Sequence, residues 1–383
     1  MKIRIEQKEL KGLLEKVLSQ TAKKTKVIAL ECVLLESKSG ILSASATDLE
    51  SYLTVTTIKY DNIEDGKLLI HNDDIKLISK LSGELEISTI SESKAVIKTN
   101  KKSISIRSYD VEGYPVFPQI NSSKSLFAIQ ENQFTVAINK LINFVSSNEN
   151  NKTMQCYNIN MKYNRIEALD GFRIGAIDIT PEIFENSKTI MIHSKINNHL
   201  KKVLDIKSTK HLQFAEQDNA YIITGADFTY VQRIIQGEYF KVEQLLSSDY
   251  DLSIKVNTKE LMDIAKFDMD IKDKDDKKPL ILNYDKESDS THIYFNNGKN
   301  KTLDKLETKE TNINKDFMIG FNPKFIYEAM KCIDDEQIVI EMTSPKSPCL
   351  IHATGEKYLV LPVNIGNNET TENEISNYIK QAS

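Results

Sequence analysis

One hydrophobic pattern occurs three times along the chain: a short alternating strand followed by an amphipathic helix. In the first copy, residues 2–5 alternate, and apolar residues follow at helical spacing at Leu10, Leu13, Leu14 and Val17. Residues 126–129 and 252–256 begin two further copies, whose helices carry Phe134, Ile138, Leu141, Ile142 and Val145, and Leu261, Ile264, Ala265 and Ile271. Leu10 and Phe134 are 124 positions apart, and Phe134 and Leu261 are 127 apart. A repeat of this length predicts tandem copies of one domain.

A second amphipathic helix is predicted in each copy. It opens at residues 70–71, 192–193 and 320–323, where Pro323 suits a first helical turn. Its apolar positions are Ile75, Ile78 and Leu81 in the first copy, Ile196, Leu200, Val203 and Leu204 in the second, and Phe325, Ile326, Ala329, Met330 and Ile333 in the third. Alternating strands follow each helix, at residues 84–88, 210–214 and 337–342. Each copy therefore has two helices and enough strands to form sheets, which predicts an α+β domain.

The repeats divide the chain into three predicted α+β domains, at residues 1–122, 123–248 and 249–365, and a polar C-terminal extension at 366–383. Asp48 and Asp170 lie 122 positions apart, between the two helices of the first and second copies. The third copy shows no convincing counterpart of these aspartates. Its middle, residues 268–316, is charged and poorly periodic. We therefore assign no elements to that stretch.

Composition narrows the class of protein. Hydrophobic residues make up 40% of the 383 positions and charged residues 27%, and no long apolar run occurs. The N-terminus lacks the apolar stretch of an export signal, so we expect a cytoplasmic protein with no membrane partner. The cysteines are scattered, which predicts reduced core thiols and neither disulfides nor a zinc site; they are Cys32, Cys156, Cys332 and Cys349.

Candidate catalytic and metal-binding groups are weak. The sequence has no phosphate-binding loop, nucleophile elbow, zinc helix or dinucleotide turn, so we predict a non-catalytic protein with no cofactor and no metal. His193 and His199 are six positions apart and would diverge by about 120° on a helix, which is poor metal geometry. Asp48 and Asp170 are open to two interpretations, a catalytic carboxylate pair or aspartates that each hold their own turn. The second is favoured.

Positive charge is locally concentrated although the net charge is −5. Residues 192–210, predicted as one helix, have a single acidic residue, Asp205, against Lys195, Lys201, Lys202, Lys207 and Lys210. A second cluster comprises Lys16, Lys23, Lys24 and Lys26. One interpretation is an ordinary solvated helix face. The other is a surface that attracts a phosphate backbone, which would bind DNA without regard to base sequence.

Four segments resemble the beta subunit family of bacterial DNA polymerase III, the beta sliding clamps: residues 46–50 (ATDLE), 170–174 (DGFRI), 237–240 (GEYF) and 358–365 (YLVLPVNI). With the repeat order they cover residues 1–365. The resemblance implies a head-to-tail homodimer whose six domains close a ring around double-stranded DNA, with helices lining the hole. The function implied is processivity: the ring tethers the polymerase III catalytic subunit, is opened by a clamp loader, and docks other proteins through clamp-motif peptides. The alternative is a divergent clamp-like scaffold that binds peptides and does not close on DNA.

The resemblance also assigns site residues. A hydrophobic peptide pocket with one arginine at its rim is expected at Tyr157, Leu169, Gly171, Phe172, Arg173, Ile174, Phe240, Leu245, Leu361, Pro362 and Val363. Three positions depart from the family pattern and put the peptide preference in doubt. The family usually has His at the position of Phe172, and often has Arg at the positions of Gln244 and Asn364. By the resemblance, DNA contacts are expected at Lys24, Lys195, Asn322 and Phe325, and the dimer interface at Ile104 and Ile106 against Met269 and Ile271. The basic stripe adds Lys201 and Lys202 to the expected DNA contacts.

The C-terminal extension has no counterpart in the resemblance, since family members usually finish at the strand that here ends at Ile365. We expect residues 366–383 to be a disordered polar tail. The alternative is that Ile375, Tyr378 and Ile379 fold back over the peptide pocket and compete with partners.

Overall fold

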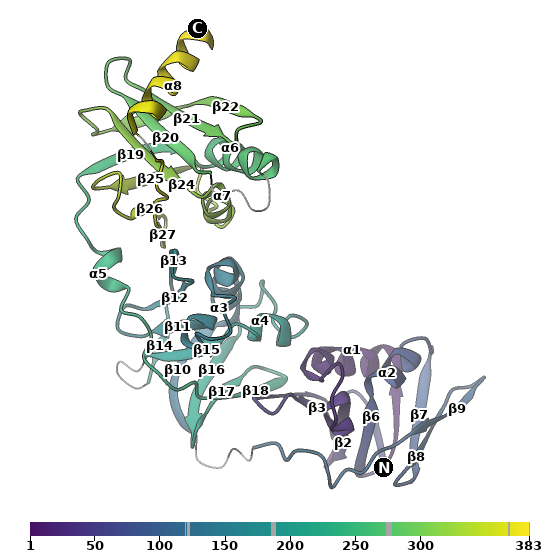
Figure 1. Cartoon of the computed structure of the whole chain (residues 1–383). Coiled ribbons are helices and arrows are strands. Elements are labelled where there is room, and N and C mark those ends of the chain that lie inside the picture. Colours follow the sequence, from purple (N-terminus) through teal and green to yellow (C-terminus); the bar gives the residue numbers. More distant parts are fainter. Residues whose placement is uncertain (119, 121–122, 185–188, 273–277, 367, 383) are drawn as a thin grey trace. The chain divides into compact units, whose positions relative to one another are not determined.

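The structure is a computed structural model that describes residues 1–118, 120, 123–184, 189–272, 278–366 and 368–382. The chain forms two compact units. Unit 1 comprises residues 1–139 and 179–236, and unit 2 comprises residues 140–178 and 237–383 (Figure 1). Among the described residues, no helix has the length and apolar character needed to cross a membrane.

Unit 1 contains a five-stranded antiparallel sheet with strand order β5-β1-β7-β8-β9. Its strands are β5 (Asp61–Glu64), β1 (Lys2–Glu6), β7 (Glu84–Ser91), β8 (Lys94–Lys98) and β9 (Ser103–Arg107). Ile3, Ile5, Leu85 and Ile87 are buried, as their alternation predicts. β9 has β8 as its neighbour on one side and is an edge strand of this sheet.

A nine-stranded sheet in unit 1 joins the first two repeats, in the order β14-β10-β16-β17-β18-β4-β3-β2-β6. The first repeat supplies β2 (Cys32–Lys38), β3 (Ile41–Thr47), β4 (Ser51–Thr57) and β6 (Gly66–His71). The second supplies β10 (Lys124–Gln130), β14 (Glu182–Ile183), β16 (His211–Gln217), β17 (Ala220–Thr224) and β18 (Phe228–Arg233). β4 and β18 pair antiparallel, with Leu53 opposite Tyr230, so the two repeats share one continuous sheet.

The helices of unit 1 include α1 (Gln7–Val17), α2 (Asn72–Ile78), α3 (Glu131–Leu141), which ends at the unit boundary, and α4 (Ile196–His199). The predicted apolar stripe of α1 is confirmed, because Leu10, Leu13, Leu14 and Val17 are all buried. α1 and α2 contact each other (Figure 1). In the second repeat, Phe134 of α3 meets Phe214 edge-on, with ring centroids 5.4 Å apart.

The prediction of one long helix over residues 192–210 is wrong. His193 ends strand β15 (Ile190–His193), α4 stops at His199, and residues 201–210 form turns. Asn197 and Asn198 are weak helix formers, and the Asn197 amide donates to the Ile138 carbonyl of α3 instead (2.9 Å). In this segment Leu200 is still buried, and Val203 and Leu204 are half-buried. Spacing alone could not distinguish these turns from a helix.

Unit 2 is built around a sheet that contains, in order, β11-β12-β13-β27-β26-β25-β19-β23. The second repeat supplies β11 (Cys156–Asn160), β12 (Arg165–Leu169) and β13 (Arg173–Asp178), and the third supplies β19 (Leu252–Asn257), β23 (Thr308–Thr311), β25 (Gln337–Met342), β26 (Cys349–Ala353) and β27 (Glu356–Val360). β13 and β27 pair antiparallel, with Ile174 opposite Leu359. The second and third repeats are therefore joined as the first and second are.

The third repeat completes its domain with a four-stranded sheet in the order β22-β21-β20-β24. These strands are β20 (Leu280–Asp285), β21 (Ser290–Asn296), β22 (Lys301–Leu306) and β24 (Phe317–Phe321). Two helices, α6 (Thr258–Ile271) and α7 (Pro323–Met330), pack against each other, and a short helix, α5 (Glu243–Leu246), precedes them. As predicted, α7 begins with Pro323, and Asn322 caps it. The stretch 268–316 thus repeats the strand order of the first copy, with residues 273–277 outside the described residues.

The C-terminal extension is a helix, α8 (Asn368–Ala382), and the prediction of a disordered tail is wrong (Figure 1). Ile375 is buried against Ile281, Tyr294 and Met318, on the four-stranded sheet. The hydroxyl of Tyr294 donates to the Glu374 carboxylate (3.0 Å). Ile375 and Ile379 are four positions apart and pack on one face. The alternative expectation also fails, since this stripe covers the four-stranded sheet and not the expected pocket residues.

Candidate functional site

The same tight turn occurs once in each repeat. The Asp170 carboxylate accepts hydrogen bonds from the backbone N–H groups of Phe172 (2.9 Å) and Arg173 (3.1 Å). Asp48 does the same with the N–H groups two and three positions later, at 3.1 and 2.8 Å. The residue after each aspartate has a positive φ, 73° at Leu49 and 93° at Gly171. The prediction that each aspartate holds its own turn is confirmed.

The third copy of this turn is centred on Asn297, which the sequence analysis missed. Its side-chain oxygen accepts from the N–H groups of Lys299 (3.0 Å) and Asn300 (2.7 Å), and Gly298 has a φ of 85°. Asn replaces Asp here, and both residues form such turns. The signal was the sequence Asn-Asn-Gly at residues 296–298, which is typical of a turn between strands.

Arg173 follows the second turn and is buried, with 6% of its surface exposed. Its guanidinium donates to the carboxylates of Asp170 (2.9 Å) and Glu328 (2.5 Å) and to the Asn143 carbonyl. It also lies over the ring of Phe325, 4.4 Å from the centroid. Arg173 lines the cavity described below, as an arginine beside a pocket was expected to do, but its charge is already paired. A buried guanidinium needs such partners, and here two carboxylates and an aromatic ring already balance its charge.

A cavity of about 500 Å³ opens beside this arginine, entirely within unit 2. Phe172 and Phe325 lie together on one wall, with ring centroids 6.1 Å apart, and Phe172 is 60% exposed. The remaining lining combines apolar and polar groups, among them Ile142, Val145, Ser147, Asn148, Met154, Lys324 and Glu328. An exposed aromatic ring above a mixed cavity is the geometry that suits a short peptide anchor.

Unit 2 also has an apolar cluster that contains several of the predicted pocket residues. Leu169 and Ile174 are buried in it with Val242, Leu246 and Leu359, and Leu245 and Leu361 pack against it partly exposed. The Leu361 N–H donates to the Phe172 carbonyl (2.9 Å), which ties the cluster to the turn at Phe172. The structure thus brings together Leu169, Gly171, Phe172, Arg173, Ile174, Leu245 and Leu361.

Other predicted pocket residues lie outside this apolar cluster. Tyr157 is fully buried and is a core residue. Pro362 and Val363 are half-buried, and the Val363 N–H donates to the Gly320 carbonyl (2.8 Å). Phe240 precedes α5 and is 55% exposed, so it is available for contact. Met154, Tyr239 and Val242 complete the apolar surface and were not predicted.

The lysines predicted to contact DNA are exposed, but on turns and not along one helix. Lys24, Lys195, Lys201 and Lys202 all lie on the surface of unit 1. Lys195 pairs with Glu50 (2.8 Å) and Lys202 with Glu15 (3.2 Å), so part of the local charge is neutralised. The other two predicted contacts lie in unit 2. Asn322 caps α7 by accepting from the Lys324 N–H (3.1 Å), and Phe325 lies in the cavity beside Phe172.

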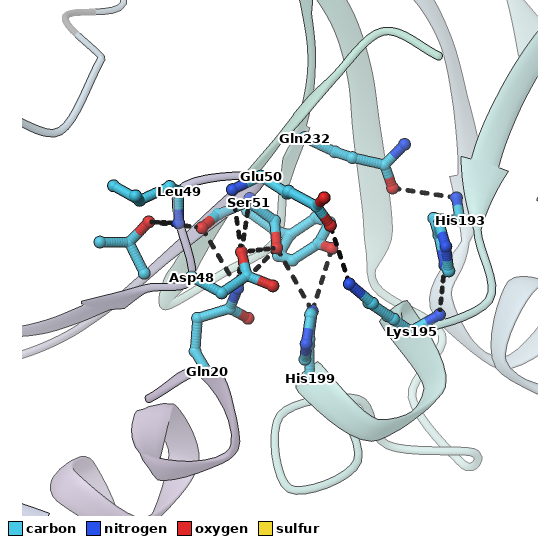
Figure 2. Close-up of polar contacts among 11 residues, drawn as sticks. Gln20, Asp48, Leu49, Glu50, Ser51, His193, Lys195, His199 and Gln232 are labelled. Atoms are coloured by element: carbon cyan, nitrogen blue, oxygen red, sulfur yellow. Dashed lines mark hydrogen bonds and ion pairs between the residues drawn. The ribbon is translucent and has the colours of Figure 1, made fainter. Parts of the chain in front are cut away.

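A buried polar network surrounds the first turn in unit 1 (Figure 2). The Ser51 hydroxyl donates to Asp48 (3.0 Å), and Gln20 donates to both residues. From the second repeat, His199 approaches with Nδ1 3.5 Å from the Ser51 oxygen and 3.2 Å from the Tyr230 hydroxyl. The network fastens the first repeat to the second.

Burial lowers the pKa of His199 to about 4, so this imidazole is neutral at pH 7. Burial also lowers the pKa of His193, whose Nδ1 accepts from the Lys195 N–H (3.1 Å). Both rings therefore have structural partners. Within the described parts of the chain, no group of three His, Cys, Asp or Glu side chains could hold a metal ion.

The predicted dimer-interface residues lie on two elements. Ile104 and Ile106 belong to the edge strand β9, where Ile106 is buried within unit 1. Met269 and Ile271 are half-buried at the end of α6, which packs against β22. The assignment of these residues to a dimer interface stays a prediction.

Comparison with known proteins gives consistent results. Residues 1–118 match the family model described as the N-terminal domain of the DNA polymerase III beta subunit, and residues 243–363 match the C-terminal domain of the same subunit. The chain is 24% identical to a beta sliding clamp of Mycoplasma capricolum over 341 residues, covering 86% of this chain and 88% of the relative. It is 20% identical to a beta sliding clamp of Staphylococcus epidermidis over 311 residues, covering 76% and 77%.

Solved structures show the same fold. The DNA polymerase sliding clamp of Bacillus subtilis superposes with a TM-score of 0.88 at 19% identity, covering 95% of this chain and 99% of that one. The DNA polymerase III beta subunit of Thermotoga maritima superposes with a TM-score of 0.83 at 21% identity, covering 95% and 100%.

Proposed function

The chain belongs to the DNA polymerase III beta subunit family, the beta sliding clamps, and on that premise we propose that it encircles duplex DNA as a head-to-tail homodimer and tethers the polymerase for processive synthesis. The ring is supported by the way in which neighbouring repeats are joined, which is the same at both junctions. β4 pairs with β18 and β13 pairs with β27, which leaves edge strands at β9 and β22. A head-to-tail contact between copies can close this series into a ring.

The proposed role is mechanical and non-catalytic. A closed ring holds DNA by topology, so it needs no strong or sequence-specific contact. The exposed lysines of unit 1, with Lys24, Lys201 and Lys202 among them, would face the phosphate backbone and act through screened electrostatic attraction. A ring also requires a clamp loader to open it. Its place of action would be the cytoplasm, where the bacterial chromosome is copied.

The ring is tested by loading and cutting. The protein is loaded onto nicked circular DNA with a clamp loader, unbound protein is removed, and the circle is linearised with a restriction enzyme. A topological clamp stays on the intact circle and slides off the linear product. Retention on linear DNA with free ends, or failure to load, would instead support the peptide-binding scaffold that does not close on DNA.

We further propose that unit 2 docks peptide motifs of polymerases and other replication and repair proteins. Support comes from the exposed Phe172 and Phe240 beside the apolar cluster of Leu245 and Leu361. An amphipathic peptide would insert apolar side chains there, with backbone groups meeting the polar lining. The aromatic Phe172 favours apolar or aromatic anchors over charged ones.

Replacement of an exposed ring tests the docking site. Phe172→Ala should weaken binding of a fluorescent clamp-motif peptide about 10-fold or more, because exposed aromatic anchors dominate such contacts. Phe267→Ala is a matched control, since Phe267 is 58% exposed on α6 and lies outside the cavity. Equal affinities for the two variants would exclude Phe172 from the docking surface.

A further inference from the structure

The linker between β18 and β19 contains α5, a helix of only four residues (Figure 1). Val242 and Leu246, at its two ends, are buried in the apolar cluster of unit 2, and Leu245 packs against that cluster partly exposed. A helix of one turn is not stable by itself in water, because its first hydrogen bond requires several backbone angles to be fixed. Contacts with other elements must therefore hold α5 in place.

A buried arginine of the second repeat holds the start of α5. Arg165 is the first residue of β12, and only 8% of its side chain is exposed. Its guanidinium pairs with the carboxylate of Glu167 (2.5 Å) and with that of Glu243 on α5. The ring of Tyr163 covers it, with the centroid 4.8 Å from the guanidinium carbon. Arg165 therefore has one carboxylate partner inside the sheet and a second one on α5.

The third repeat holds the other end of the helix. The Lys357 ammonium group of β27 donates to the Leu246 carbonyl (3.1 Å), and the Tyr250 hydroxyl donates to the Leu245 carbonyl (2.8 Å). The last carbonyl groups of a helix have no partner within it, so these two donors satisfy them. The single turn of α5 is thus fixed at its start by the second repeat and at its end by the third.

We propose that Arg165 is a positioning residue of the peptide-docking surface: by holding Glu243 it keeps α5 formed and Leu245 in place for an incoming apolar anchor. This inference rests on the docking function proposed above for unit 2. A peptide that meets a formed α5 does not have to order it, so the ion pair contributes to affinity without touching the peptide. When the pair is broken, α5 is formed in only a fraction of the molecules, and the apparent affinity falls by that fraction.

Glu243 is the better place to break the pair. Its side chain is 32% exposed, whereas Glu167 is 1% exposed and would be left as an uncompensated buried charge if Arg165 were removed. Glu243→Ala leaves Arg165 paired with Glu167. The fold of unit 2 should therefore survive this substitution, and its melting temperature should stay close to that of the wild type.

Stopped-flow binding of the fluorescent clamp-motif peptide tests the positioning role. Glu243→Ala should weaken binding about fivefold through slower association at an unchanged dissociation rate, because the bound peptide itself packs α5 in place. Glu243→Gln should stay within about twofold of the wild type, since its amide oxygen still accepts from the guanidinium. Asp249→Ala, at an exposed position of the same linker, removes the same charge and should leave both rates unchanged.

A second variant approaches the pair from the other side. Arg165→Lys keeps a positive charge beside Glu167, but a single ammonium group lacks the fork that serves two carboxylates. It should weaken peptide binding as Glu243→Ala does, and the double variant should be no weaker than either, because both changes break one contact. The Ser247 N–H, which donates to the Glu243 carbonyl (3.0 Å), should exchange with solvent faster in both variants.

The possible results separate the two proposals. Equal peptide affinity of Glu243→Ala and Asp249→Ala would overturn the positioning role and leave the docking function standing. Weaker binding that arises from faster dissociation alone would make Glu243 a direct peptide contact, and would overturn the positioning role as well. A wild-type chain that binds no clamp-motif peptide would overturn the docking function itself.

Discussion

At the scale of single residues, the aspartates of the tight turns make several stabilising hydrogen bonds each. Asp170 holds two backbone N–H groups and one side of the buried Arg173 guanidinium. Its carboxylate therefore stabilises the turn and the junction together. Sequence spacing identified the aspartate as a turn residue. It could not show that Arg173 points inward, because that depends on Glu328, which is 155 positions away along the chain.

Asp170→Ala should lower the free energy of unfolding by about 2–4 kcal/mol, since it removes two turn hydrogen bonds and one carboxylate from a buried cation. Urea denaturation followed by circular dichroism measures this loss. Asp263→Ala, at an exposed position on α6, is the control and should change stability by less than about 0.5 kcal/mol. Equal stability of the two variants would contradict the role given to the Asp170 turn.

His199 makes the unit 1 junction sensitive to acid. Its pKa of about 4 in the folded chain lies below the ordinary value near 6.5, so the unfolded chain binds the proton more tightly. The stability that this neutral ring contributes is present above pH 6.5 and is lost as the pH falls towards 4. The groups around it are His193, Lys195, Asp48 and Glu50, of which the two carboxylates partly offset the burial.

His199→Gln should therefore flatten the fall in unfolding free energy between pH 6.5 and pH 4.5, by on the order of 2 kcal/mol. Thermal unfolding at several pH values measures the slope. His211→Gln, at an exposed position that begins β16, should retain the wild-type slope. A variant slope equal to wild type would mean that other groups dominate the acid response.

At the scale of elements, prediction succeeded where one face of an element is apolar over several turns. α1 has eleven residues and a continuous stripe, so its spacing was decisive. The strands of residues 268–316 were missed because their buried residues form short continuous runs, at 280–282 and 293–295, within a highly charged segment, and such runs show no alternation. The length of the helix that contains α4 was overestimated, because the turns after His199 place apolar residues at the spacing expected of a helix. Local pattern did not reveal the partner surface on which α8 packs.

Removal of α8 tests its packing. A chain that ends at Ile365 would expose Ile281, Tyr294 and Met318, an apolar patch that Ile375 covers. We expect a lower melting temperature by several degrees and aggregation on heating, as judged by light scattering. Ile375→Asp in the full chain should produce the same effect, and Asn377→Asp, at an exposed position on α8, should not.

Peptide affinity separates this role from autoinhibition. If α8 serves only to cover the four-stranded sheet, the truncated chain and the full chain should bind a clamp-motif peptide equally well. Tighter binding by the truncated chain would restore the idea that the extension competes for the pocket.

At the scale of the whole molecule, topology and charge should have separable effects. Lys201→Glu with Lys202→Glu should slow loading onto circular DNA and reduce the salt dependence of loading, because fewer counterions are released. Once the ring is closed, its retention on an intact circle should match wild type, even at high salt. Lys286→Glu with Lys346→Glu, at exposed positions away from β22, provides a control of equal charge on unit 2. Salt-sensitive escape of the wild-type protein from an intact circle would contradict a topological hold.

The position of α8 also matters for practical handling of the protein. An affinity tag or fluorophore fused after residue 383 would extend from a helix packed on the four-stranded sheet of the third repeat, and not from the strand β27 that precedes Leu361. The helix separates the attachment point from the cavity at Phe172. A surface sensor or microscopy label attached there would therefore leave that face open to incoming partners.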